Sequence, residues 1–218
     1  MTNNNYYDVL HTTENHTGKM KGKSSLSTSP LVNEQCKRNC LKPNWVCSKC
    51  YSIRMMKMYK TLEAVLRKNY FLLTQGILPF ETLPIINKLD FRLEAFGDLA
   101  NENHVINFFN ICNKNARTIF AIWTKNPHLI DAVLKAGYEK PANLIIIYSN
   151  PILNTTITLK TVHEKMNYYF IDKTFNVYDK HYLKEHPAIV PNCGSRSCEN
   201  CNLCYTFNDV TEIIEILK

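Results

Sequence analysis

The sequence predicts an α/β fold with a parallel sheet, specifically a partial or open (βα) barrel that carries Cys-rich loops. Strand-like and helix-like segments alternate along the middle of the chain, and short connections join them. With 218 residues, 45% of them hydrophobic, the chain suffices for one such domain. It is shorter than the roughly 250 residues of a complete eight-fold barrel, which favours a partial one.

The first quarter of the chain divides into a leader, a strand, a cysteine-rich loop and a helix. Residues 1–22 have no apolar period and are expected to form a flexible leader, which leaves residues 23–218 as a single α/β domain. A short strand is expected in "KSSLSTSPL", stopping at Pro30. In residues 51–73, apolar side chains recur every three or four positions, which predicts one amphipathic helix.

The alternation is clearest in the middle of the chain. We expect strands at 90–98, 118–125 and 143–149, and helices at 101–115 and 126–137. Asn101 and Asn126 are placed as helix caps, and Pro127 occupies the first helical position of the second helix. Residues 167–180 add one or two strands, and a short helix is expected in the final "DVTEIIEILK".

Eight of the nine cysteines fall into two quartets. The N-terminal quartet, in residues 36–50, is Cys36, Cys40, Cys47 and Cys50; the C-terminal quartet, in residues 193–204, is Cys193, Cys198, Cys201 and Cys204. The ninth, Cys112, lies on the apolar face of a predicted helix and is expected to be a buried core thiol.

The cellular compartment influences whether cysteines form disulfides or bind metals. The polar start of the chain does not have the pattern of a secretory signal, so we expect a cytoplasmic protein. The apolar run "NLIIIYSNPIL" is far shorter than the roughly 20 residues that span a bilayer, so no membrane association is expected. Cytoplasmic cysteines bind metals or catalyse more often than they form structural disulfides.

The spacing favours iron–sulfur clusters, with zinc as the open alternative. Two cysteines separated by two residues can hold one metal, and the C-terminal run C-x4-C-x2-C-x2-C is close to the tight spacing of cubane clusters. The N-terminal run is C-x3-C-x6-C-x2-C. We therefore expect one or two [4Fe–4S] clusters.

The formal net charge of +7 is concentrated near the N-terminal quartet. Residues 19–68 contain 12 Lys and Arg but only Glu34 and Glu63. This basic segment indicates either attraction of nucleic acid or compensation of the charge of metal-bound thiolates.

Further candidate ligand contacts lie where the predicted strands end. Because ligands of parallel sheets bind beyond the carboxyl ends of strands, the first cysteine loop, "FGDL" and "TKNP" are expected on one rim. Arg92 and Glu94, two residues apart, are expected to share one face of their strand. Thr124 and Lys125 are candidates for binding an anionic group.

Four stretches of the chain carry a family resemblance. They are "CSKCYSIRM" between a strand and a helix, "RLEAFGDL" and "FAIWTKNP" at strand ends, and a final Cys-x2-Cys-x2-Cys followed by an aromatic residue. From about Lys19 to Tyr205 the chain resembles the phage "gene product 88" family, which implies that a phage-encoded member acts in the host cytoplasm. More loosely, it is similar to the partial (βα) barrels of radical S-adenosylmethionine enzymes.

The second similarity implies a [4Fe–4S] cluster held by three cysteines, with S-adenosylmethionine on the open iron. Such enzymes use C-x3-C-x2-C spacing, whereas six residues separate Cys40 from Cys47 in this chain. If all four cysteines bind one cluster, no iron remains open. The similarity also places Gly97 and Asp98 at a turn whose backbone meets the methionine amino group, which a glycine would permit.

Three functions are therefore open. The first is an iron–sulfur protein on a radical-enzyme-like barrel, with a substrate and catalytic residues that the sequence does not identify. The second is a zinc-stabilised α/β module that binds nucleic acid through its basic segment. The third is an electron-transfer protein with saturated clusters and a redox partner.

Overall fold

The computed structural model describes residues 9–194 and 197–217, and its strands form one mixed sheet. The strands are β1 (Thr12–Glu14), β2 (Ser24–Leu26), β3 (Asp90–Leu93), β4 (Ile119–Thr124), β5 (Leu144–Ser149), β6 (Lys173–Tyr178) and β7 (Glu212–Ile216). The helices are α1 (Glu34–Cys40), α2 (Tyr51–Met58), α3 (Lys60–Gln75), α4 (Glu102–Lys114), α5 (Pro127–Lys135), α6 (Leu159–Met166), α7 (Lys180–Glu185) and α8 (Cys198–Cys201), with 3₁₀ turns η1 (Val46–Lys49) and η2 (Phe80–Thr82).

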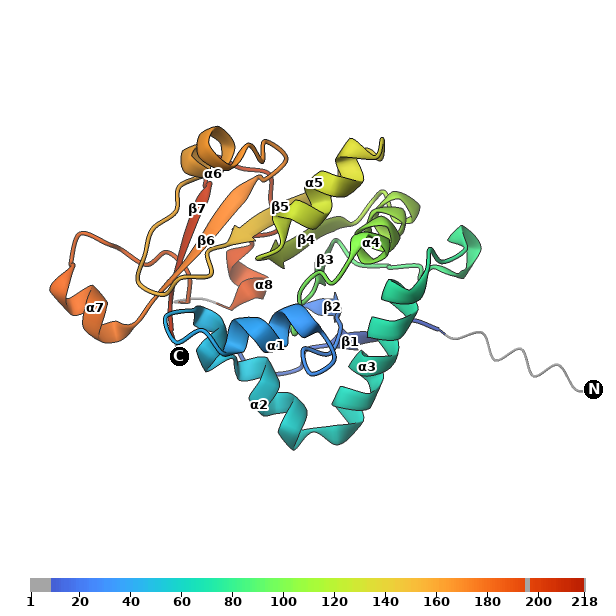
Figure 1. The fold of residues 1–218 in the computed structure, drawn as a ribbon, viewed down its shortest axis with the longest axis horizontal. Coiled ribbons are helices and arrows are strands. Elements are labelled where there is room, and N and C mark those ends of the chain that lie inside the picture. The colour runs from blue at the N-terminus through green and yellow to red at the C-terminus, as the bar shows by residue number, and fades with distance from the viewer. Residues whose placement is uncertain (1–8, 195–196, 218) are drawn as a thin grey trace, which may run out of the picture.

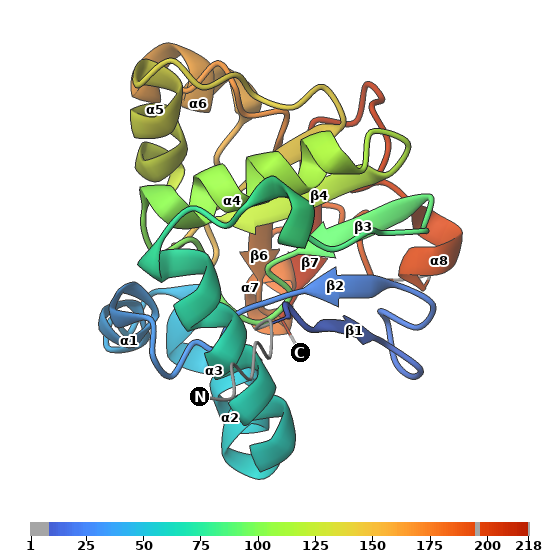
Figure 2. The same ribbon diagram turned by 90° about the vertical axis from the view of Figure 1, so that its right-hand side faces the viewer.

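The strands lie in the sheet in the same order as in the chain, from β1 to β7. β1 is antiparallel to β2, and every later neighbouring pair is parallel. Because crossovers between neighbouring parallel strands have one hand, consecutive order places α4, α5 and α6, which connect β3 to β6, on the same face. In Figure 2, α5 and α6 lie on one side of the strands and α8 on the other.

The large hydrophobic core fills the space between the sheet and the crossover helices. Phe91 pairs in register with Phe120, which lies beside Leu144, so these side chains form one row across three strands. Helix α4 packs onto this face with most of its apolar residues buried, including Phe108 and Ile111. The structure therefore confirms the predicted α/β class with a mostly parallel sheet.

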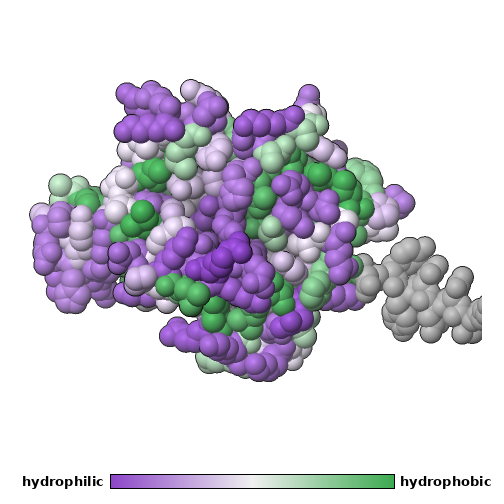
Figure 3. All heavy atoms as spheres, viewed as in Figure 1, coloured by the Kyte–Doolittle hydropathy of each residue, from purple (hydrophilic) through white to green (hydrophobic). Residues whose placement is uncertain are grey.

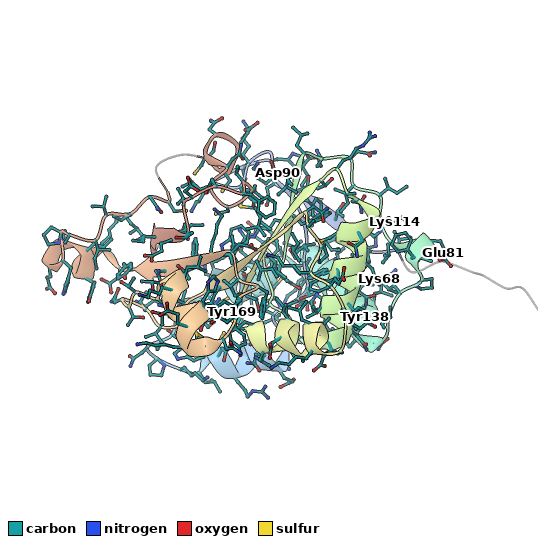
Figure 4. All side chains as sticks on the ribbon, turned by 90° about the horizontal axis from the view of Figure 1, so that it is seen from above. Lys68, Glu81, Asp90, Lys114, Tyr138 and Tyr169 are labelled. Atoms are coloured by element: carbon teal, nitrogen blue, oxygen red, sulfur yellow. The ribbon has the colours of Figure 1, made fainter. Side chains whose placement is uncertain are left out.

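The opposite face of the sheet carries a smaller cluster. It consists of Ala121, Ile145, Ile147, Tyr205 and Ile213, and three cysteines of the C-terminal quartet pack against it. Figure 4 shows Asp90, at the start of β3, on the side opposite Tyr138 and Tyr169, which follow α5 and α6. The C-terminal cysteine segment, which belongs to the connection from β6 to β7, thus covers the face opposite α4, α5 and α6.

Several local predictions are confirmed. The side chain of Asn101 caps α4 by accepting a hydrogen bond from the His104 backbone N–H (3.0 Å), and Pro127 is the first residue of α5. Strand β5 is buried along its whole length, as its continuous apolar sequence indicates. The Cys112 thiol is completely buried in the large core.

The helix predicted for residues 51–73 is interrupted. Helix α2 ends at Met58, and Tyr59 takes φ −109° and ψ 84° before α3 begins at Lys60. Both helices keep an apolar face, with Met56 buried in the first and Leu66 in the second. The periodicity identified the helical residues, but the change of direction at Tyr59 has no local signal.

The helix predicted in "DVTEIIEILK" is wrong, because residues 212–216 form strand β7 beside β6. Ile213 lies opposite Phe175 and is fully buried on the sheet face that carries the small cluster. A short apolar run fits either a helix or a strand by periodicity alone. Pairing with β6, more than thirty residues earlier, decides the outcome here.

The segment expected as a flexible leader contains regular structure. Strand β1 pairs with β2 in a tight antiparallel ribbon, with Thr13 opposite Ser25. The His11 backbone N–H donates to the Asn69 side chain (2.9 Å), which fixes this segment to α3. The part of the expected leader in residues 1–8 lies outside the described residues.

In the view of Figure 3 the surface is mainly hydrophilic, with hydrophobic residues in separate groups. Among the described residues, no helix is both long and apolar enough to cross a membrane. Figure 1 shows α1 and α2 along the lower edge of the molecule, beneath the sheet.

The strand assignment of the C-terminus predicts unequal roles for two adjacent isoleucines. Replacing Ile213 by Ala removes a fully buried side chain and should lower the free energy of unfolding by about 2–5 kcal/mol. Ile214→Ala is the matched control. Ile214 is only partly buried, so its replacement should lower the free energy of unfolding less. Chemical denaturation measures both, and equal losses would contradict the assignment.

Candidate metal centre

The N-terminal quartet lies in short helical turns that follow β2. Cys36 and Cys40 are one turn apart on α1, whose N-terminus is capped by Asn33, accepting hydrogen bonds from the Gln35 (2.9 Å) and Cys36 (3.3 Å) backbone N–H groups. Cys47 lies in η1, and Cys50 separates that turn from α2. These elements are short helices rather than the open loop that the sequence predicts.

The four thiols of this quartet lie within electrostatic reach of one another. Burial, together with Cys50 and Cys47, raises the pKa of Cys40 to about 11, Cys50 acting also through a hydrogen bond. Burial likewise raises the pKa of Cys36 and of Cys47. The thiolates of Cys36, Cys40 and Cys47 are therefore disfavoured unless a cation joins them.

Asp98 ties the N-terminal quartet to the ends of β3 and β4. Its carboxylate accepts hydrogen bonds from the Thr124 hydroxyl (2.6 Å) and from the Lys125 backbone N–H (3.0 Å). The Asn33 side chain donates to the Asp98 carbonyl (2.8 Å), which joins α1 to the same point. The three segments predicted to share a rim therefore meet there.

Lys125 is the cation nearest to this quartet. Burial by itself lowers the pKa of Lys125, but the thiolate of Cys47 and the carboxylate of Asp98 raise it above its usual value. Burial raises the pKa of Asp98, and Lys125 opposes that change. Lys125 is only partly exposed and interacts with the cysteines rather than lying free in solvent.

Glu94 has a structural position at the end of β3. Its backbone has a φ of 57°, and its buried carboxylate accepts hydrogen bonds from the Thr28 hydroxyl (2.6 Å), the Thr28 N–H (3.1 Å) and the Gly97 N–H (3.0 Å). The His104 ring nitrogen Nε2 lies 3.2 Å from the same carboxylate. Glu94 does not share partners with Arg92, because β3 ends at Leu93 and the chain turns between them.

The C-terminal quartet occupies the opposite face of the sheet. The Cys193 backbone N–H donates to the Ile214 carbonyl (3.1 Å), which fixes this cysteine to β7. Cys198 and Cys201 begin and end α8, and Cys204 lies in the following turn. The Lys19 ammonium donates to the Cys193 sulfur (3.0 Å), so a residue from the start of the chain joins the quartet.

In the C-terminal quartet, too, neighbouring thiols raise pKa values. Burial raises the pKa of Cys204 to about 12, and Cys193, Cys198 and Cys201 contribute to the same change, opposed by Arg92. Burial raises the pKa of Cys193 and of Cys198 as well. Four cysteines spread over twelve positions thus converge on one part of the sheet.

Arg92 lies beside the C-terminal quartet. Its guanidinium is 4.1 Å from the centre of the Trp123 ring, and its Nη1 donates to the Met20 sulfur (3.5 Å). Trp123 packs against the small cluster, as do Cys193, Cys198 and Cys204. Burial by itself lowers the pKa of Arg92, but Tyr205 and Tyr51 raise it, as do two thiolates of the C-terminal quartet.

All nine cysteines, which lie within the described residues, are free of disulfides. In the same part of the chain, no three His, Cys, Asp or Glu side chains already converge at metal–ligand distances. The donor set itself, four sulfurs in each group, fits zinc or an iron–sulfur cluster.

Some residues of these sites gave little signal in the sequence. His104 is completely buried beside Glu94, whereas a helix-end histidine is expected to be exposed. Lys19 and Lys173 approach the C-terminal quartet from residues far away in the chain. Only the unusual number of apolar and β-branched neighbours of Lys173 could have indicated that its strand is buried.

The turn held by Glu94 predicts that Gly97 cannot be enlarged. A Cβ at Gly97 would lie 2.5 Å from the Thr28 Oγ1 and 2.7 Å from the Glu94 Oε2. Gly97→Ala should therefore lower the free energy of unfolding by about 1–3 kcal/mol, measured by chemical denaturation. Gly76→Ala is the control, because nothing lies within 4 Å of its added Cβ. Equal stability of the two variants would show that the turn yields freely.

Comparison with known proteins agrees with the first of the two resemblances. A family model described as "Gene product 88" matches residues 11–206, which include β1 to β6 and both cysteine quartets. No curated protein and no solved structure matches the chain. Because the match covers most of the sequence, the chain belongs to the gene product 88 family.

Proposed function

We propose that this chain is an iron–sulfur protein whose sheet forms a partial (βα) barrel of the kind used by radical S-adenosylmethionine enzymes. One observation carries the proposal: eight cysteines gather into two groups of four thiols, without a disulfide. Cubane clusters take four thiolates or three. The residues that would hold them are Cys36, Cys40, Cys47 and Cys50, and Cys193, Cys198, Cys201 and Cys204.

The order of the strands supports the barrel part of the proposal. Consecutive parallel strands with α4, α5 and α6 on one face are the arrangement expected of an opened segment of a (βα) barrel. In barrels of this type, active sites lie at the carboxyl ends of the strands. The N-terminal quartet adjoins that rim, beside Asp98 and Lys125.

The residues of the rim have distinct tasks in this proposal. Asp98, Thr124 and Glu94 hold the loops in place through hydrogen bonds, so they position the cysteines and leave little capacity to bind a substrate. The ammonium of Lys125 is the group that can contact an anionic ligand or a metal-bound thiolate. When bound, an iron–sulfur cluster supplies single electrons, and one with an open iron can also bind S-adenosylmethionine.

The raised pKa values agree with a site that is completed by metal. Cys40 and Cys204, with pKa values of about 11 and 12, lose their protons at neutral pH only when a metal takes their place. Free thiols of this kind persist in a reducing compartment, which accords with a cytoplasmic location. Each quartet is in reach of cations, so electron exchange with an acidic redox partner is also compatible with the site.

The first prediction concerns metal content. Protein purified without oxygen should be brown and contain iron and sulfide in comparable amounts. Cys47→Ala and Cys201→Ala should each remove roughly half of the iron, because each breaks a different thiol group. Cys112→Ala is the control, since that thiol is buried in the large core away from both quartets. Colourless protein that contains zinc would rule out the proposal and favour the zinc-stabilised nucleic-acid module.

The second prediction concerns reactivity. If one iron of the N-terminal centre is open, reduced protein incubated with S-adenosylmethionine should form 5′-deoxyadenosine, measured by chromatography. We expect Cys47→Ala to abolish this product, whereas Cys112→Ala should retain it. Protein with intact iron and sulfide that forms none would instead be an electron-transfer protein with saturated clusters.

A further inference from the structure

Resting on the proposed metal-binding function, we propose that Arg92 and Lys173 are the buried countercharges of the C-terminal quartet. In this assignment all four cysteines, Cys193, Cys198, Cys201 and Cys204, bind as thiolates, and the two cations stabilise the resulting anionic centre. The N-terminal quartet has no equivalent pair among the described residues. The two centres are therefore unequal in how firmly they hold metal.

Arg92 has no carboxylate partner among the described residues. Its guanidinium lies on the Trp123 ring, its Nη1 bonds only to a thioether sulfur, and its buried Nε has no hydrogen-bond partner. An arginine keeps its charge at every physiological pH. A buried, permanent cation without an anion is costly, so the position of Arg92 beside Cys198 and Cys204 indicates that negative charge develops there.

Lys173 approaches the same quartet from β6. It is 2% exposed, and its ammonium donates to two neutral oxygens, the Asn208 side chain and the Val210 carbonyl, both at 2.7 Å. Burial lowers the pKa of Lys173, and the Cys204 thiolate raises it. The nearby Asp172 carboxylate also acts on Lys173, but it is bonded to Lys140 at 2.6 and 2.7 Å.

The other lysines around the quartet already have carboxylate partners. Lys19 forms an ion pair with Glu215, and Lys23 forms one with Asp90 at 2.7 Å. Each of these pairs is neutral as a unit. Among the described residues, Arg92 and Lys173 are thus the buried cations at the C-terminal quartet that have no ion-pair partner.

The charges match those of a fully ligated centre. Four thiolates around one Zn²⁺, or around a cubane of charge about +2, leave a net charge of about −2. Arg92 and Lys173 together supply the opposite charge. A centre with only three thiolates would leave one of these buried cations uncompensated, so the balance favours ligation by all four cysteines.

The charged groups around the N-terminal quartet differ from those around the C-terminal quartet. The groups that act on Cys36 include the carboxylates of Asp98 and Glu94, and the cation that opposes them is Lys125. Buried carboxylates therefore offset the cations Lys125 and Lys42 there, whereas in the described part of the chain Arg92 and Lys173 have no ion-pair partner at the C-terminal quartet. The same contrast should make an iron–sulfur cluster in the C-terminal quartet easier to reduce than one in the N-terminal quartet.

The test measures metal release from the C-terminal centre in the full chain. All variants carry Cys47→Ala, which disrupts the N-terminal site. EDTA is added to the metal-loaded protein, and the metal that the protein retains is measured over time by elemental analysis. Arg92→Met and Lys173→Met should each release metal about tenfold faster than the background. Arg92→Lys and Lys173→Arg keep the charge and should release it at nearly the background rate.

A second variant covers the case in which a neutral substitution prevents folding. Asn208→Asp changes an exposed residue and places a carboxylate next to Lys173, so it should also accelerate release. Lys125→Met, tested in the same background, removes a cation from the other centre and should have no effect on the C-terminal metal. With iron bound, loss of either cation should also lower the reduction potential of the cluster, because the added electron is less well compensated.

The outcomes separate this inference from the proposed function. Release at the background rate in the folded Arg92, Lys173 and Asn208 variants would overturn the countercharge assignment, and so would fast release by the charge-keeping variants. Absence of any metal in the Cys47→Ala background would overturn it too. Zinc in place of iron would refute the iron–sulfur function but not the countercharge assignment. The rate at which zinc is released to EDTA would still test the effect of Arg92 and Lys173.

Discussion

The architecture depends on one constraint, which is that parallel strands β2 to β7 lie in the sheet in chain order. The crossovers between β3 and β6 return over the same face, so their helices and the large core gather there. The connection from β6 to β7 instead covers the other face. The segment with the C-terminal quartet fills that position, packing Tyr205 and three cysteines against β4, β5 and β7.

The same constraint brings the carboxyl ends of neighbouring strands to one edge. Helix α1 follows β2, Asp98 follows β3, and Lys125 follows β4, and these points are joined by hydrogen bonds through the Asp98 carboxylate and carbonyl. Glu94 reinforces the arrangement by holding Thr28 and Gly97. Several rim residues that resemble ligand contacts in the sequence are thus occupied in fixing the loops, which leaves the thiols as the reactive groups.

The thiols illustrate how burial and function are linked in this protein. A buried thiol remains protonated, and neighbouring thiols make ionisation harder still, as the raised pKa values of Cys40 and Cys204 show. A metal cation reverses this preference, because it interacts with several thiolates at once. In the metal-bound state that we propose, Arg92 and Lys173 would stabilise the thiolates of the C-terminal quartet.

The sequence by itself determined the features with a local cause. Hydrophobic periodicity predicts β3 to β6 and α4 and α5 closely, and the cysteine spacing identifies both quartets, because these signals lie within short segments. Tertiary structure alone decided that residues 212–216 form a strand, that α2 and α3 separate at Tyr59, and that Glu94 turns away from Arg92. It also brought Lys19 to Cys193, 174 positions away. Contacts of this kind depend on how distant segments pack, and no local pattern encodes that packing.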